Sequence, residues 1–124
     1  MVQLLSGVPT RPILPNVFHL TLVHNTGVAF GLMRNSGLLV TIGTIGVILF
    51  FCWFLARGAA LQGKLFGFSS SLILGGAIGN LIDRLRVGAV IDFLDFRIWP
   101  VFNLADSCIT VGAVLMAWQI LKSK

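Results

Sequence analysis

The sequence contains no glutamate and no tyrosine, and only 10% of its 124 residues are charged. Without glutamate, the chain cannot form the His-Glu-x-x-His zinc site of metalloproteases. Every acidic residue is an aspartate, and all four lie in the short stretch from Asp83 to Asp106. Because carboxylates beside apolar segments are costly unless they pair, hydrogen-bond or perform chemistry, this stretch is the first candidate for a functional site.

Cysteine is also scarce, and the two cysteines, Cys52 and Cys108, lie in or beside different apolar segments. They have no metal-ligand spacing and form no disulfide framework, so we interpret both as small apolar core residues. A net charge of +5 raises nucleic acid as a partner, but the nine Lys and Arg residues are scattered singly. A nucleic-acid interface needs a basic stripe, so we expect anionic lipid headgroups and no nucleic acid.

Hydrophobic residues make up 56% of the chain, and its mean hydropathy is +0.96. These values predict an integral membrane protein with one membrane domain over residues 1–124. Its class is mainly α, a bundle of three transmembrane helices with a small periplasmic β-element. The predicted spans are residues 38–56, 65–82 and 105–121, each long enough to cross hydrocarbon. Small residues such as Gly76 permit close helix packing.

Residues 1–37 contain three prolines and are predicted to form a β-element and a turn at the membrane surface. From Phe18 onward the side chains alternate with a period of two, which predicts a strand. The following Asn-Thr-Gly, which ends at Gly27, supplies turn chemistry. His19 and His24 lack a third ligand nearby, so no metal site is predicted.

The distribution of lysine sets the expected orientation. All three lysines, Lys64, Lys122 and Lys124, lie in the loop after the first span or in the tail, which favours that side as the cytoplasmic one. The opposite side would then carry the arginines Arg11, Arg34, Arg84, Arg86 and Arg97, so the count of basic residues alone leaves the orientation open. Three spans then bring the N-terminal β-element and the acidic stretch to the opposite, periplasmic face. This convergence predicts a single shared site there.

Residues 83–104 are predicted to form a periplasmic loop that contains a strand. Side chains alternate after Gly88, so an extended chain turns Asp92 and Asp95 to opposite faces. Only one of the two can join a shared site, and alternation alone does not identify which. Asp106 also keeps two interpretations: a helix N-terminal carboxylate favoured by the helix dipole, or a member of the site.

The positions of the remaining residues exclude several protease chemistries. A Ser/Lys dyad needs a lysine beside a serine, yet the lysines are predicted at the other face; Ser/His catalysis within the bundle needs a histidine there, yet both precede the first span. Two aspartates that share a proton in a poorly hydrated site can activate water and protonate a carbonyl. The residues alone leave open an aspartic hydrolase and a non-enzymatic helix bundle whose aspartates are caps and ion-pair partners.

Four motifs in order carry a resemblance to a known family. They are NTGVAFGL from Asn25, GGAIGNLIDR from Gly75, VIDFLDF from Val90 and FNLADSCIT from Phe102. Together they resemble the bacterial lipoprotein signal peptidases, signal peptidase II. The resemblance implies a helix bundle with a periplasmic β-cradle and an aspartic endopeptidase of the bacterial inner membrane. Such an enzyme removes the signal peptide of a prolipoprotein before a diacylglyceryl-modified cysteine, and the resemblance implies no cofactor and no metal.

The same resemblance assigns roles by position. The family's catalytic aspartates fall on Asp92 and Asp106, so the resemblance selects Asp92 over Asp95. Asp83 matches an aspartate next to the site and is expected to orient Arg84 by a charge-assisted contact. The positions expected to bind substrate or support the site are Asn25, Gly27, Asn80, Asp83, Arg84, Asn103 and Ala105.

The chain departs from the family pattern at one place. Members of the family carry a further transmembrane helix before the β-cradle, which makes four, and residues 1–15 do not match that helix. The resemblance therefore implies either an active signal peptidase II or an inactive, shortened member of the family.

Overall fold

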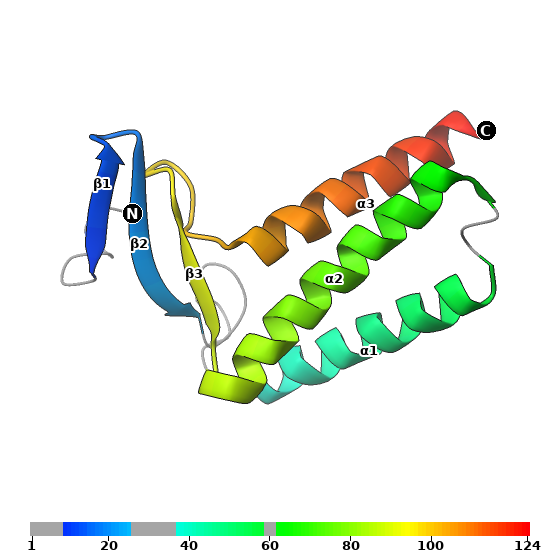
Figure 1. Cartoon of the computed structure of the whole chain (residues 1–124), viewed down its shortest axis with the longest axis horizontal. Coiled ribbons are helices and arrows are strands. Elements are labelled where there is room, and N and C mark those ends of the chain that lie inside the picture. Colours follow the sequence, from blue (N-terminus) through cyan, green and yellow to red (C-terminus); the bar gives the residue numbers. More distant parts are fainter. Residues whose placement is uncertain (1–8, 26–36, 59–61) are drawn as a thin grey trace.

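The computed structural model describes residues 9–25, 37–58 and 62–124. In chain order the elements are β1 (Thr10–Leu14), β2 (Phe18–Asn25), α1 (Gly37–Ala56), α2 (Lys64–Val87), β3 (Val90–Asp95) and α3 (Leu104–Lys122). The helices extend from one side of a three-stranded sheet (Figure 1). Each is long and apolar enough to cross a membrane. The predicted class, a mainly α membrane protein with a small sheet, is confirmed.

Helix α1 packs against α2 and carries apolar side chains around its whole circumference. No residue of α1 is buried, and Leu38, Leu49 and Trp53 are among its many exposed side chains. A helix that is apolar on every face and unburied is stable when hydrocarbon surrounds it. Its range agrees closely with the span predicted at residues 38–56.

Helices α2 and α3 approach each other through glycines. A methyl group at Gly76 would lie 2.5 Å from the Ala105 carbonyl oxygen, and one at Gly112 would lie 2.7 Å from the Ser69 carbonyl oxygen. Only glycine allows the two backbones to come this close, as small residues commonly do between helices in lipid. The contact at Ala105 therefore sets the position of the first turn of α3 against α2.

Helix α2 runs well past the end of the second predicted span. It ends at Gly88, whose φ of 75° lies in the left-handed region and whose N–H donates to the Arg84 carbonyl. Arg84 and Arg86 in the last turn interact favourably with the carbonyl end of the helix dipole. Asp83 and Arg84 therefore lie on α2 and not in the loop predicted at residues 83–104.

The sheet has the order β1-β2-β3 with antiparallel neighbours. The strand predicted from Phe18 is confirmed as β2, whereas β1 was not predicted because prolines surround it. Pro12 fits there because β1 is an edge strand, where a missing N–H breaks no ladder on the open side. The register of β2 against β3 shifts between Leu20 and Val23.

The sheet lies at the end of the bundle where α2 ends and α3 begins (Figure 1). Strand β3 follows α2 after a short turn and leads into α3, so it lies beside both helix ends. This connection brings the acidic stretch and the N-terminal β-element to one end of the molecule, as the three spans predict.

Candidate active site

Asp92 lies on β3 with only 3% of its surface exposed. Asn25 Nδ2, at the end of β2, donates to Asp92 Oδ2 at 3.3 Å. Asn103 Nδ2 donates to Asp92 Oδ1 at 3.0 Å. Side-chain amides from two different parts of the chain therefore hold the two oxygens of this buried carboxyl group.

Asp106 lies in the first turn of α3 and forms a capping box with Asn103. The Asp106 N–H donates to Asn103 Oδ1 at 2.8 Å, and Asp106 Oδ2 accepts from the Asn103 N–H at 3.3 Å. The helix-terminal interpretation of Asp106 is thus confirmed. Its other oxygen, Oδ1, accepts from Asn80 Nδ2 at 3.0 Å, so capping uses only one of the two oxygens.

The side chain of Asn103 connects the two aspartates. Its Nδ2 donates both to Asp92 Oδ1 and to Asn80 Oδ1, each at 3.0 Å. Asn80, buried on α2, donates in turn to Asp106. We call this set the aspartate network: Asn25, Asn80, Asp92, Asn103 and Asp106. It places two carboxyl groups in one continuous set of hydrogen bonds between β2, β3 and the facing ends of α2 and α3.

The network changes the acidity of Asp92. Burial raises the pKa of Asp92 from its ordinary value of 3.8 to about 6, and the charges of Asp106 and Asp83 act in the same direction. The hydrogen bonds from Asn25 and Asn103 oppose this rise because amide N–H groups stabilise the carboxylate form. Asp92 therefore holds a proton at a far higher pH than an exposed aspartate, and a second carboxyl group lies in the same network.

Arg84 supplies a positive charge to the site. Its guanidinium interacts electrostatically with both aspartates of the network and with Asp83. Its Nη1 donates to Thr44 Oγ1 of α1 at 3.4 Å, so α1 holds this side chain. Asp83 acts on Arg84 through its charge, but within the described residues it forms no hydrogen bond or ion pair with Arg84, and its Oδ2 accepts the Ile91 N–H at 3.1 Å. Neighbouring residues on a helix point in different directions, which separates the two side chains.

Comparison with known proteins identifies the family. The model of the family described as signal peptidase (SPase) II matches residues 1–122. A lipoprotein signal peptidase of Halothermothrix orenii is 49% identical over 113 residues, which cover 87% of this chain and 75% of the relative. One of Moorella thermoacetica is 48% identical over 110 residues, which cover 89% and 73%. The chain belongs to the signal peptidase II family.

Solved structures agree with this assignment. Two structures of a bacterial membrane enzyme superimpose with TM-scores of 0.82 and 0.81, each at 31% sequence identity. The first alignment covers 92% of this chain and 71% of the other, and the second covers 94% and 77%. The chain is therefore a protease of the signal peptidase II type in a membrane setting, and prolipoproteins are its substrate class.

Two further residues of this signal peptidase II were predicted to bind substrate or support the site, Ala105 and Gly27, and the structure describes only the first of them. Ala105 packs at the α2–α3 contact, with its carbonyl against Gly76 and its methyl group 3.4 Å from where a Cβ on Gly79 would lie. It supports the site by placing the turn that carries Asp106. Gly27 lies outside the described residues.

Asp95 has partners separate from those of the aspartate network. Its carboxylate accepts from the Thr21 hydroxyl at 2.7 Å, the Arg97 N–H at 2.9 Å and Arg97 Nη1 at 2.6 Å. Burial opposes its ionisation, but the hydrogen bonds from Thr21 and Arg97 and the arginine charge outweigh burial and lower the pKa of Asp95. Asp92 and Asp95 therefore have separate sets of hydrogen-bond partners in the described structure, and the prediction that they face opposite sides of the strand stays a prediction.

Sequence reasoning missed Thr44 and Thr21 as partners of charged groups. Thr44 lies in an otherwise apolar helix, where a hydroxyl is a candidate hydrogen-bond acceptor for a charged group. Thr21 lies in the alternating strand, where a buried polar side chain signals a partner across the sheet. Neither signal identifies the partner, because each contact joins residues far apart in the chain.

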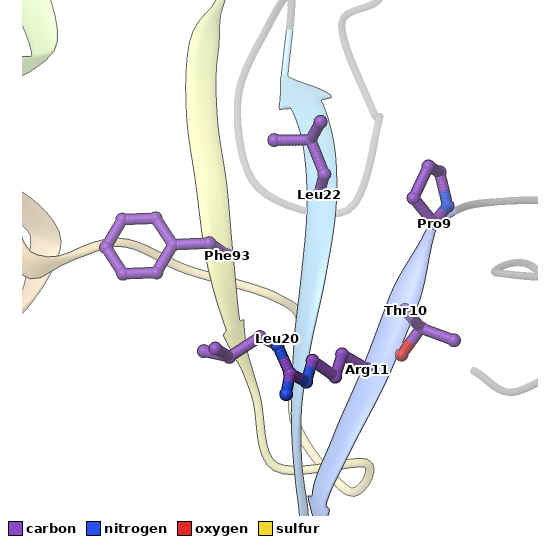
Figure 2. Close-up of a pocket in the computed structure, with 6 residues that line it drawn as sticks. All are labelled: Pro9, Thr10, Arg11, Leu20, Leu22 and Phe93. Carbon is purple, nitrogen blue, oxygen red and sulfur yellow. The ribbon is translucent and has the colours of Figure 1, made fainter.

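The sheet of this signal peptidase II also carries a shallow hollow of about 290 Å³. Figure 2 shows Leu20, Leu22 and Phe93 projecting to one side of β2 and β3, with the Arg11 guanidinium beside Leu20. Its lining is mostly apolar and also includes Pro9 and Thr10. No member of the aspartate network lines the hollow, so it is a separate surface.

Proposed function

We propose that this signal peptidase II is an aspartic endopeptidase with Asp92 and Asp106 as its catalytic dyad. It cleaves a diacylglyceryl-modified prolipoprotein before the modified cysteine, at the periplasmic face of the bacterial inner membrane. The observation that carries the proposal is the double contact of Asn103. This side chain hydrogen-bonds Asp92 while it caps the helix turn that holds Asp106, so one residue orients both carboxyl groups.

The electrostatics of the site favour different roles for the two aspartates. Asp92 has a raised pKa of about 6 and is suited to enter the reaction as the neutral acid. Asp106 lies in the first turn of a helix, where a negative charge is favourable, and it accepts hydrogen bonds at both oxygens. We assign Asp106 as the ionised base.

The proposed reaction adds water to the scissile peptide. The Asp106 carboxylate takes a proton from water as the water oxygen bonds to the carbonyl carbon, while Asp92 gives its proton to the carbonyl oxygen. The resulting gem-diol collapses when Asp106 transfers its proton to the leaving nitrogen and Asp92 recovers a proton from a diol hydroxyl. The C–N bond breaks, a new cysteine N-terminus is released, and both aspartates return to their starting states.

The remaining network residues hold this geometry. Asn80 and Asn103 restrict the rotation of the two carboxyl groups, and Asn25 holds Asp92 from the sheet side. Arg84 supplies a positive charge that balances the carboxylate charge of the dyad. The site lies where the helix ends meet the sheet, so an apolar signal peptide in the bilayer can present its cleavage point there (Figure 1).

The test is substitution of each aspartate in the full chain, followed by a gel-shift assay of a diacylglyceryl prolipoprotein. We expect Asp92→Asn and Asp106→Asn each to lower processing by roughly 10²–10⁴-fold, because each loses a group that moves a proton. Asp95→Asn is the comparison variant: it removes a buried carboxylate from the same strand but not from the network, so we expect it to lower processing far less than either dyad substitution.

Thermal denaturation of each variant separates loss of catalysis from loss of fold. An Asn at position 106 keeps one oxygen that can accept the Asn103 N–H but loses the acceptor of the Asn80 Nδ2 bond, so we expect a modest fall in Tm with the fold retained. Near-parental processing by Asp92→Asn would refute the dyad. Absence of processing by the folded parent chain would instead identify an inactive member of the family.

A further inference from the structure

The loop between β3 and α3 is closed firmly at its base. The Phe102 N–H donates to the Leu94 carbonyl at 3.1 Å, and the Phe102 carbonyl accepts from the Leu94 N–H at 2.8 Å. The Phe96 ring stacks on Phe102 at 5.9 Å and lies 4.9 Å from Phe18. The tip of the loop, residues 96–100, is therefore held on a rigid base.

The tip contains a strained turn that Asp95 stabilises. Arg97 has a φ of 67°, and the Ile98 N–H donates to the Phe96 carbonyl at 2.8 Å, which closes a three-residue turn. A non-glycine residue in this conformation persists only when its surroundings hold it. Asp95, which is completely buried, accepts both the N–H and the guanidinium of Arg97, so it acts as the clamp of this turn.

The clamped turn projects apolar side chains away from the protein. Ile98 is 93% exposed and Trp99 is 60% exposed. Single exposed apolar residues are normal, but here a strained backbone and a buried ion pair hold two adjacent large side chains outward. Packing within the described part of the chain does not account for these outward side chains, whereas contact with an apolar partner would.

The position and charge of the turn point to the bilayer. The loop lies on the side of the sheet from which the helices extend (Figure 1), and it leads into Leu104, an exposed apolar residue in the first turn of α3. Three residues separate the tip of the loop, residues 96–100, from this exposed start of a span. The charge of Arg97 is neutralised by Asp95 at 2.6 Å, so the turn can approach hydrocarbon without an unpaired charge.

The other two tryptophans of the chain each lie near one end of a span. Trp53 lies near the end of α1 with Arg57 at 5.8 Å from its ring, and Trp118 lies near the end of α3 with Lys122 at 4.9 Å. Trp99 lies at the opposite end of the bundle. Tryptophan concentrates at both interfaces of membrane proteins because its ring is apolar and its N–H is polar.

We propose that residues 96–100 form a membrane anchor that places Ile98 and Trp99 in the headgroup region of the leaflet nearest the sheet. Asp95 is its positioning residue, because it fixes the turn that presents them. The anchor ties β3 to the bilayer surface and so sets the depth of Asp92 relative to the lipid. This inference needs only the membrane setting of the chain and does not depend on the assignment of the dyad.

The test uses the fluorescence of Trp99 in the full chain carrying W53F and W118F. The protein is reconstituted in phosphatidylcholine/phosphatidylglycerol vesicles whose acyl chains carry bromine either near the headgroup or near the chain end. We expect the shallow bromines to remove most of the Trp99 fluorescence, the deep bromines to remove much less, and aqueous acrylamide to quench weakly. Adding D95N should reduce bromine quenching and raise acrylamide quenching, because the turn is released.

Two controls keep the outcome interpretable. I98S changes the apolar tip without touching a hydrogen-bonding side chain, so it tests the anchor even where D95N lowers Tm. The W53F/W99F chain, which reports Trp118 alone, should show the same quenching with and without D95N. Trp99 that is open to acrylamide and insensitive to lipid bromine overturns the proposal. Protection that appears only after a signal peptide is added also overturns it, and assigns the turn to substrate.

Discussion

Asp92 and Asp95 lie three residues apart on one strand, and their carboxyl groups have opposite electrostatic surroundings. Burial dominates at Asp92 and raises its pKa to about 6. At Asp95 the hydrogen bonds from Thr21 and Arg97 outweigh burial, and the pKa is lowered. The neutral form is favoured more at Asp92 and the charged form more at Asp95, so two chemically identical side chains differ in how readily they hold a proton.

This contrast predicts opposite effects of pH on two matched variants. The folded state binds the Asp92 proton more tightly than the unfolded state, so the stability from Asp92 is present below pH 3.8 and is lost as the pH rises to about 6. Asp92→Asn keeps the neutral form at every pH. We expect its free energy of unfolding, relative to the parent, to improve between pH 4 and 7 by on the order of 1–3 kcal/mol.

Asp95→Asn should behave in the opposite way. Its carboxylate stabilises the fold above pH 3.8, and that stability is lost only as the pH falls through the lowered folded value. The variant should therefore be less stable than the parent by a constant amount from pH 5 to 7. Thermal denaturation in detergent measures both variants, and parallel pH profiles for the two would contradict the assigned surroundings.

At the scale of elements, the contact between α2 and α3 decides where Asp106 lies. Gly76 faces the Ala105 carbonyl, one residue before Asp106, whereas a methyl group on the neighbouring Gly75 would meet nothing within 4 Å in the described structure. Two adjacent glycines therefore differ in function. One permits the close approach of the helices, and the other lies on an open face of α2.

Substitution of Gly76 gives a testable prediction, and the same substitution at Gly75 is its control. Gly76→Ala places a methyl group 2.5 Å from backbone and must displace α3, so we expect a loss of about 1–3 kcal/mol in stability and a marked loss of processing. Gly75→Ala should be neutral or slightly stabilising, because alanine favours helix. Denaturation and the gel-shift assay test both. Equal behaviour of the two variants would show that this contact does not position the dyad.

At the scale of the whole molecule, the charged residues separate between the two ends of the bundle. Lys64, Lys122 and Lys124 lie at one end, whereas Arg97 at the sheet end is neutralised by Asp95. Within the described residues the lysine end also carries Arg57 and no aspartate, whereas the sheet end carries Arg11, Arg84, Arg86 and Arg97 together with all four aspartates. The lysine end therefore has the larger net positive charge, and we predict that it faces the cytoplasm. The aspartate network then faces the periplasm.

Reporter fusions test this orientation in cells. Alkaline phosphatase is active only after export, so we expect it to be active when fused after Arg97 and silent when fused after Lys124. A cytoplasmic reporter such as β-galactosidase should give the reverse pattern. Active phosphatase at Lys124 together with silence at Arg97 would invert the topology and place the dyad on the cytoplasmic side.

Local patterns in the sequence determined the membrane class, the ranges of α1 and α3, the start of α2 and the strand from Phe18, and they offered a helix-terminal role for Asp106. These features depend on composition, periodicity and residues within one or two helical turns, so they can be predicted before any long-range contact is known. The four sequence motifs also identified the family and the two candidate catalytic aspartates. They did not identify the contacts that hold these two aspartates in place.

The tertiary structure alone decided how the charged and polar groups pair. Asn25 reaches Asp92, Asn80 reaches Asp106 and Arg84 reaches Thr44, and each pair joins positions far apart in the chain. Asp83 and Arg84 are adjacent in sequence, yet in the described structure Asp83 accepts the Ile91 N–H and acts on Arg84 only through its charge, because adjacent residues do not face each other on a helix surface. The partners of a buried polar group depend on which backbones approach, and here glycine contacts between α2 and α3 and the register of β2 against β3 set that approach.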